Sequence, residues 1–242
     1  MFPTQDPGPA TPRPPGRPAA VPDWTRNNAR AAGAFYLVTF VASIPAVLLL
    51  RPVLNDPGYI LGAGSETRVL VGCLLDAVNA LACIGTAVAV FPVVRRQNES
   101  MALGFVASRM LEAAIIMVGV VSLLAVVTLR QDVAGGAGAD AASLEITGQA
   151  LVAVRDWTFQ FGPNLCAGIN ALLFGTLLYR SRLVPRIMPV IGLIGAPLLL
   201  ASTLATMFGA YEQMSTPAAV LGLPIATWEL SLGIWMIVKG FN

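Results

Sequence analysis

Ionisable side chains within long apolar stretches are the residues of this 242-residue chain whose types and spacing could do chemistry. Arg109 and Glu112 are three residues apart, which places them on one face of a helix, and Glu229 lies in a separate apolar stretch. In hydrocarbon such a side chain costs about 2.5 kcal/mol or more, so it must be paired, protonated or in contact with water. We predict that Glu229 faces the protein interior near Arg109 and Glu112, where the three bind a ligand. The alternative is a local ion pair in which Arg109 extends to the membrane interface.

A second polar pattern runs along the apolar stretch that contains Asp76. Asp76, Asn79 and Cys83 recur at spacings of three and four residues, so they form a stripe on one helical face. Amide and small residues at this spacing are typical of hydrogen bonds between neighbouring helices in a membrane. The same stripe suits a face that contacts a substrate, and both interpretations stand for Asp76 and Asn79.

The run Gly162-Pro163-Asn164 interrupts another apolar stretch. Pro163 has no backbone N–H, so the carbonyl of Phe159 should lack its helical partner and the helix should break there. Broken helices at membrane depth line cavities or pack on protein, and transporters use them as binding sites. Asn164 therefore joins the candidate binding residues. The alternative is that Gly162 and Pro163 form a plain packing kink.

Several kinds of chemistry are excluded or disfavoured by what the chain lacks. It contains no histidine, which excludes a Ser-His-Asp triad and an imidazole metal site. Its three cysteines, Cys73, Cys83 and Cys166, lie within apolar runs and fit small buried side chains better than disulfides or zinc ligands. No residue is assigned a catalytic role. We expect no metal, no cofactor and, with a net charge of only +2, no nucleic-acid partner.

The elements that must position these residues follow from the composition. Hydrophobic residues make up 56% of the chain and charged residues only 12%, against about 25% charged residues in ordinary soluble domains. This excludes a water-soluble globule and predicts an all-α, polytopic membrane helix bundle. A membrane span needs about 20 apolar residues, and six stretches meet this requirement. We place the spans at about 31–50, 69–94, 102–129, 157–179, 185–209 and 218–238.

The N-terminal region differs from the rest of the chain. Eight of the 18 prolines fall within the first 22 residues, and such a segment cannot form a regular helix. We predict a disordered, Pro-rich cytoplasmic tail over residues 1–28, followed by a six-helix transmembrane domain over residues 29–242.

Basic residues alternate between the two predicted sides of the membrane. One side carries ten Lys and Arg residues, whereas the other carries only Arg51, Arg68 and Arg130. The positive-inside rule then places both termini in the cytoplasm. We expect the protein in the plasma membrane. The ten residues are Arg13, Arg17, Arg26, Arg30, Arg95, Arg96, Arg180, Arg182, Arg186 and Lys239.

Several stretches, in order, resemble a bacterial integral-membrane family known as domain of unknown function 4386. The resemblance covers nearly the whole chain after about residue 29. It implies a protein that spans the membrane several times, and it supplies neither an activity nor catalytic residues. The stretches are "GAGSETRVLVGCLLDAVNALACIGTAVAVFPVVRRQNE", "LGFVASRMLEAAIIMVG", "VRDWTFQFGPN", "LYRSRLVPRIMPVIGLIGAPLLLAS" and "WELSLGIWMIVKGF".

These observations favour binding or transport of a small molecule or ion through the polar cluster, with the lipid bilayer and a small-molecule or lipid ligand as partners. Six spans are few for a transporter unless the protein forms a homodimer. The first alternative is a structural or accessory membrane subunit, in which every buried polar group serves packing. The second is an intramembrane enzyme that acts on a lipid or prenyl-like substrate, with Glu229 or Asp76 as general acid.

Overall fold

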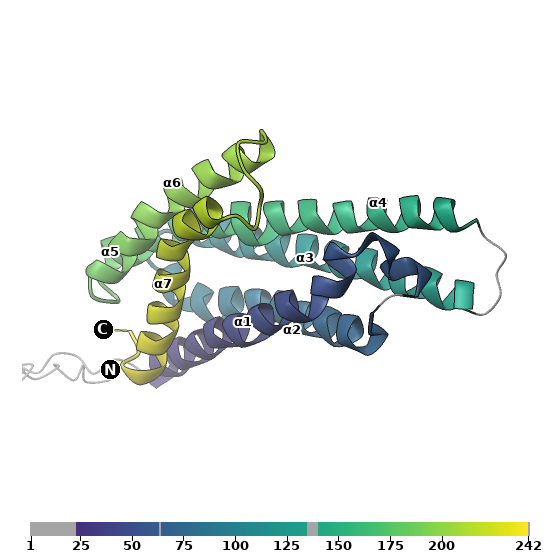
Figure 1. Cartoon of the computed structure of the whole chain (residues 1–242). Helices are drawn as coiled ribbons and strands as arrows, with labels where there is room; N and C mark the ends of the chain where they lie inside the picture. Colours follow the sequence, from purple (N-terminus) through teal and green to yellow (C-terminus); the bar gives the residue numbers. More distant parts are fainter. Residues whose placement is uncertain (1–22, 63, 135–139, 242) are drawn as a thin grey trace, which may run out of the picture.

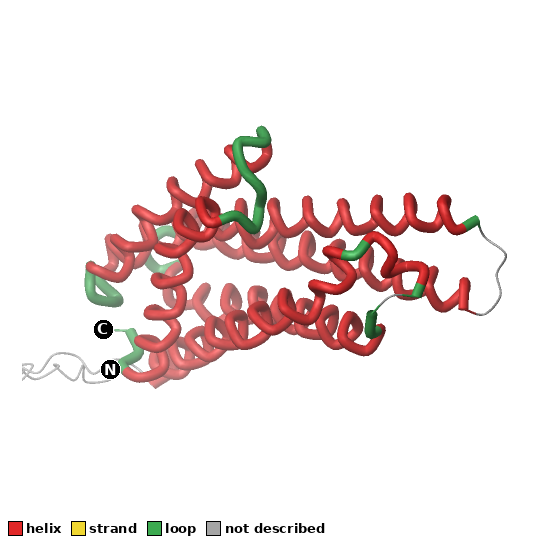
Figure 2. Tube along the Cα trace, in the orientation of Figure 1, coloured by secondary structure: helices red, strands yellow, loops and turns green. Residues whose placement is uncertain are grey.

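The computed structural model describes residues 23–62, 64–134 and 140–241, and over these ranges the chain is helical, without strands (Figures 1 and 2). Six of its helices are long and apolar enough to cross a membrane, as predicted. The elements, in order, are α1 (Asp23–Asn55), the short 3₁₀-helix η1 (Pro57–Leu61), α2 (Glu66–Val94), α3 (Glu99–Ala134), α4 (Ala141–Phe159), the π-helical segment η2 (Gln160–Cys166), α5 (Ala167–Ser181), α6 (Ile187–Met207) and α7 (Thr216–Val238).

The start of the first helix corrects the predicted boundary of the tail. Residues 1–22 lie outside the described residues, but α1 already begins at Asp23, so residues 23–28 belong to a helix. Tertiary contacts explain why this turn is helical. The Arg96 guanidinium lies 4.4 Å from the centre of the Trp24 ring, and Thr25 is buried. The loop between α2 and α3 therefore holds the first turn of α1 in place.

The fourth membrane helix is longer than the predicted span at 157–179. Segments α4, η2 and α5 follow one another without a loop, so the helix runs from Ala141 to Ser181. It begins where the Asp140 carboxylate accepts a hydrogen bond from the backbone N–H of Ser143, which is a standard helix cap. Gly148 then packs against Ile60 of η1, because a Cβ at that glycine would lie 3.1 Å from the Ile60 Cδ1. Capping and packing extend the helix beyond its apolar stretch.

The helices are arranged so that both ends of the described chain meet. Helix α1 packs on α2 and α7, α3 packs on α2 and on the α4–α5 helix, and α6 packs on α5 and α7 (Figure 1). A Cβ added at Gly240 would lie 3.6 Å from the Cγ of Arg26, so the end of α7 lies beside the start of α1. We call this end of the bundle the terminal end. The last turns of α1 and α3 and the first turns of α4 lie at the opposite end (Figure 1). The loop between α6 and α7 lies beside the middle of the Ala141–Ser181 helix, where Gln213 donates a hydrogen bond to the carbonyl of Asp156.

Glycines allow the helices to approach closely at the terminal end. A Cβ at Gly33 of α1 would lie 2.6 Å from the carbonyl oxygen of Gly233 in α7, and a Cβ at Gly192 of α6 would lie 2.5 Å from the Trp228 ring. Small residues commonly pack membrane helices in this way. Beside these crossings, Tyr36, Phe105 and Phe174 join Trp228 in a fully buried aromatic cluster.

Polar residues lie on the inward faces of α2 and α3. The buried residues of α3 recur every three or four positions, and Arg109 and Glu112 share their face with Phe105 and Ile116. Helix α2 buries Asp76, Asn79 and Cys83 in the same way. The outward faces are apolar, with Leu74, Leu81, Val88 and Val121 each more than 60% exposed. A lipid environment suits these outward faces, and the charged residues point into the bundle.

Candidate functional site

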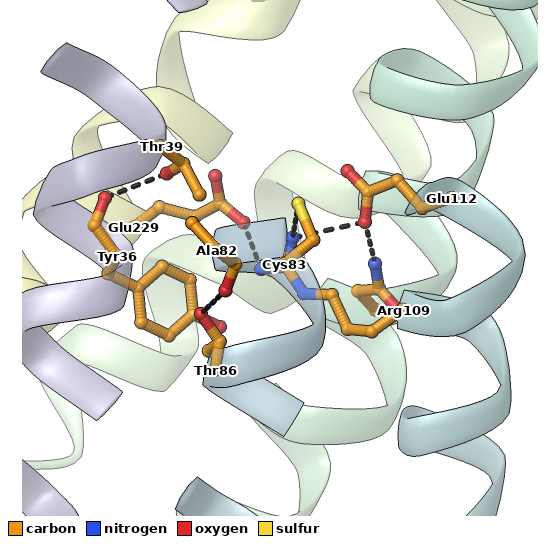
Figure 3. Close-up of polar contacts among 9 residues, drawn as sticks. Tyr36, Thr39, Ala82, Cys83, Thr86, Arg109, Glu112 and Glu229 are labelled. Carbon is orange, nitrogen blue, oxygen red and sulfur yellow. Dashed lines mark hydrogen bonds and ion pairs between the residues drawn. The ribbon is translucent and has the colours of Figure 1, made fainter. Parts of the chain in front are cut away.

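Arg109 is the centre of a buried ion-pair network that joins α3 to α7 (Figure 3). Its Nη1 lies 3.0 Å from Oε2 of Glu112, one helical turn away, and its Nη2 lies 2.9 Å from Oε1 of Glu229. Arg109 is only 2% exposed. The predicted approach of Glu229 to Arg109 is therefore present in the fold, and the side chain of Arg109 stays inside the bundle.

Two further polar side chains complete what we call the Arg109 cluster, namely Arg109, Glu112, Glu229, Asn170 and Cys83. Asn170 of α5 donates a hydrogen bond of 2.7 Å to Oε2 of Glu112, the same oxygen that accepts from Arg109. The second bond from Nη1 of Arg109 reaches Sγ of Cys83 at 3.7 Å. The cluster thus draws one side chain each from α2, α5 and α7 to the two on α3.

The aromatic cluster borders the guanidinium of Arg109. The guanidinium carbon lies 5.1 Å from the centre of the Tyr36 ring and 5.8 Å from that of Phe105. The Phe174 ring stacks against both rings and is tilted against Trp228. Cations near the faces of buried aromatic rings are stabilised by the ring quadrupole, so this layer both holds Arg109 and separates it from the terminal end.

A second ion pair joins α2 to α4. Nη2 of Arg155 lies 3.4 Å from Oδ2 of Asp76, and the Arg155 guanidinium carbon lies 4.9 Å from the centre of the Phe159 ring. Both charged residues are buried. Asp76 is thus engaged across the helix interface, while Asn79, one turn along α2, is buried without a hydrogen bond to another described side chain. The stripe on α2 serves packing at Asp76 and also borders the cavity described below.

The helix around Pro163 does not break, which corrects the prediction for Gly162 and Pro163. It widens instead into π-helical geometry over Gln160–Cys166 and continues as α5. A wider turn accommodates a residue that cannot donate a backbone hydrogen bond, and such segments are often found at functional sites. Gln160 donates from Nε2 to the carbonyl of Thr203 in α6 at 3.0 Å and accepts a bond of 3.2 Å from Asn164. Neighbouring polar groups therefore support the irregular turn.

A cavity of about 430 Å³, the central cavity, lies between these groups. Every candidate binding residue borders it: Asp76, Asn79, Arg109, Glu112, Asn164 and Glu229. So does Pro163, whereas Gly162 does not and packs toward Ile115 of α3 instead. The other walls are mostly apolar and come from α1 and α7. Ile44 and Leu48 of α1 are 58% and 48% exposed, so the cavity reaches the outward face of that helix.

The two ends of the central cavity differ. The aromatic cluster lies toward the terminal end. Helices α1 and α3 run away from that end, and Tyr36 and Phe105 come before their cavity-lining residues. Helix α5 runs toward that end, and Phe174 comes after its lining residue Ala167. Toward the opposite end, a second cavity of about 230 Å³ reaches Gln213 and Met214 in the loop between α6 and α7. The two cavities share four lining residues, Phe159, Asn164, Leu199 and Gly222. The central cavity is thus closed by packed rings at one end and adjoins the second cavity at the other.

Sequence reasoning missed the contributions of Asn170, Arg155 and Tyr36. Asn170 and Arg155 are polar residues in an apolar stretch, but nothing in the sequence indicates which carboxylate each one contacts. Tyr36 carries no such signal, because an aromatic residue in a membrane span is ordinary. Within the described ranges, no group of three or more Cys, Asp or Glu side chains is arranged to hold a metal ion.

Comparison with known proteins finds one similarity. Residues 31–240 match the family model described as "Domain of unknown function (DUF4386)", which is nearly the whole described chain. No curated protein and no solved structure matches this chain.

Proposed function

This chain belongs to the DUF4386 family, and from the geometry of its interior we propose that it is a membrane carrier that binds a small molecule in the central cavity. The observation that carries the proposal is the cavity itself, about 430 Å³ in volume and bordered by Arg109, Glu112 and Glu229. Pockets that bind small molecules have volumes of about 300–1,000 Å³, apolar walls and a few polar groups that orient the ligand. The central cavity has each of these properties.

Placement of the charged groups supports binding over a purely structural role. Ion pairs that serve only packing are more stable when protein surrounds them, because every lone pair or N–H donor that lacks a partner in a buried pair costs free energy. Glu229 and Arg109 instead border the central cavity. A ligand or water in that space would satisfy the remaining hydrogen-bonding capacity of these groups.

Different closure at the two ends supports transport through the same cavity. A carrier binds its cargo near the middle of the membrane, with one side open and the other closed. In this protein the aromatic cluster closes the terminal end, and the second cavity adjoins the opposite end. With the arginine distribution placing both termini in the cytoplasm, the closed end would face inward and the second cavity would face outward across the plasma membrane.

A pair of single-cysteine variants tests whether the cavity is accessible. In a chain with Cys73→Ala, Cys83→Ser and Cys166→Ala, Ser43→Cys places a thiol at the wall of the central cavity, whereas Val41→Cys places one on the outward face of α1, where Val41 is 72% exposed. Each protein in lipid nanodiscs is treated with methyl methanethiosulfonate, and the mass increase is followed over time. Thiols react as thiolates, which form where water reaches them. We expect Ser43→Cys to react at least about ten-fold faster than Val41→Cys.

Two neighbouring substitutions on α7 provide a matched control. Ala226 borders the central cavity and Thr227 is exposed on the outward face, so Ala226→Phe should fill the cavity while Thr227→Phe should not. We expect Ala226→Phe to slow the reaction of Ser43→Cys and Thr227→Phe to leave it unchanged. Equal rates at positions 43 and 41, or equal effects of the two phenylalanines, would contradict the proposal and favour a structural role.

A further inference from the structure

The charges around the central cavity define the class of its ligand. Building on the proposed function, we propose that the ligand is an amphipathic organic cation, whose ammonium group binds Glu229 and whose apolar part lies along α1. Three independent features lead to this class: the balance of charges, the distribution of hydrogen bonds and the nature of the cavity wall.

The charges that border the cavity do not balance. Three carboxylates, of Asp76, Glu112 and Glu229, face two guanidiniums, of Arg109 and Arg155. With all five groups ionised, the cavity carries a formal charge of −1. An unbalanced charge is costly in the low dielectric of a membrane interior, because it is neither solvated nor paired. A ligand with a single positive charge removes the imbalance, whereas an anion doubles it.

The hydrogen bonds place the unsatisfied negative charge on Glu229. The two Nη atoms of Arg109 are both engaged, with Glu112 and Cys83 at one and with Glu229 at the other. Glu112 is the more enclosed carboxylate, with its side chain 6% exposed, and it accepts a further bond from Asn170. The Glu229 side chain is 14% exposed, and within the described chain no donor reaches its Oε2. Glu229 therefore offers the cavity a carboxylate oxygen that suits an ammonium N–H.

The cavity wall favours an organic cation over an inorganic one. Within the described residues, no three carboxylates or thiols are grouped to hold a metal ion, and the only oxygens that α1 adds to the cavity wall are the hydroxyls of Thr39 and Ser43. The other α1 side chains that line the cavity are Phe40, Ile44, Val47 and Leu48. They suit an alkyl or aromatic group instead. Because Ile44 and Leu48 are also exposed on the outward face of α1, the apolar part of the ligand contacts a surface that is continuous with lipid.

Three probes with the same aromatic body and different head groups test the proposal. 2-Phenylethylamine carries an ammonium group at neutral pH, 2-phenylethanol is neutral, and phenylacetate is an anion. Each is added to the Ser43→Cys protein in nanodiscs, and the concentration that halves the rate of methyl methanethiosulfonate modification is measured. We expect this concentration to be at least about ten-fold lower for 2-phenylethylamine than for the other two, which corresponds to about 1.4 kcal/mol.

Removing the charge of Glu229 should remove this preference. With Glu229→Gln added, 2-phenylethylamine should protect no better than 2-phenylethanol, while protection by the alcohol should persist and show that the cavity is intact. Glu145→Gln is the matched control, because Glu145 lies half-buried on α4 and does not border the cavity. If Glu229→Gln fails to fold, the ranking of the three probes on the parent protein still decides the proposal.

The outcomes separate this inference from the proposed function. Rapid modification at position 43 with equal protection by all three probes would leave the cavity as a binding site and overturn the cation proposal. Stronger protection by phenylacetate, or equal protection by sodium or potassium chloride at the same concentration, would overturn it too. Slow modification at position 43 would contradict the proposed function itself.

Discussion

Replacing Arg109 with methionine should destabilise the fold more than any other removal of a single charge. The guanidinium holds Glu112 and Glu229 at 3.0 Å and 2.9 Å, and no other described cation lies within ion-pair distance of either. Methionine retains much of the length of the side chain and provides neither charge nor donor. Glu112 keeps its bond from Asn170, but Glu229 loses its only hydrogen bond within the described chain.

The magnitude follows from the two ion pairs that are lost. A hydrogen bond to a charged group contributes about 1.5–3 kcal/mol, and breaking a buried ion pair by removing one partner costs about 3–5 kcal/mol. Arg109 and Glu112 are 2% and 4% exposed, so solvent screens little of this cost. We expect Arg109→Met to lower the free energy of unfolding by about 3–5 kcal/mol.

Unfolding in mixed micelles with an increasing SDS fraction measures this loss. Arg155→Met provides a comparison. Arg155 forms one ion pair, with Asp76 at 3.4 Å, so we expect a smaller loss of unfolding free energy than for Arg109→Met. Arg68→Met is the control for an exposed arginine without an ion pair or ring contact among the described residues, and it should change the free energy of unfolding by less than about 0.5 kcal/mol.

Removing all three charges together should restore most of the stability. In the triple variant Arg109→Met, Glu112→Gln and Glu229→Gln, no buried carboxylate lacks a counter-charge, and the amide of residue 112 can still accept the bond from Asn170. Replacing a whole buried ion pair is commonly close to neutral, whereas breaking one is not. A loss below about 1 kcal/mol for Arg109→Met, or a triple variant less stable than the single one, would refute this reasoning.

Two further predictions concern topology and packing. With the native cysteines replaced, Asp140→Cys should be labelled in intact cells by a membrane-impermeant thiol reagent and Gln97→Cys should be protected, since the arginine distribution predicts a cytoplasmic terminal end. The reverse pattern would invert the orientation. Gly192→Ala should lower the free energy of unfolding by about 1–3 kcal/mol, measured in mixed micelles, because the added Cβ would lie 2.5 Å from the Trp228 ring. Gly104→Ala, whose Cβ would lie 3.6 Å from the nearest side chain, should have no such effect, and equal losses for both would contradict the packing argument.

The sequence alone was sufficient for the fold class and for one long-range contact. Low charge and six long apolar stretches determine a helical membrane bundle, because in hydrocarbon every backbone N–H and C=O must be paired within its own helix. An unpaired charged side chain in hydrocarbon is costly too, so a buried Arg109 requires a carboxylate as its partner. Glu112 lies on the same helical face, and Glu229 lies at a similar depth in another span, which is why their meeting was predictable.

Helix boundaries were less predictable, because they depend on contacts that hydropathy does not contain. The first turn of α1 is helical because Trp24 packs under Arg96, and α4 begins at its cap on Asp140 outside any apolar stretch. The same holds at Pro163. Sequence reasoning correctly located an irregular turn, but whether a helix breaks or widens depends on neighbours such as Thr203 that accept the side-chain bonds around it.

Partners and cavity were decided by the tertiary structure. Helical periodicity tells which face of a helix points inward, but it does not tell which helix stands opposite that face. Asp76 therefore pairs with Arg155, and Glu112 accepts a hydrogen bond from Asn170, only when α2, α3 and the α4–α5 helix are packed together. The central cavity is likewise a property of several helices at once, since it exists where the side chains of α1 and α7 leave unfilled the space beside the Arg109 cluster. The local sequence determines which side chains each helix can bury. The packing of all the helices determines the contacts of the buried charges and the cavity that these charges border.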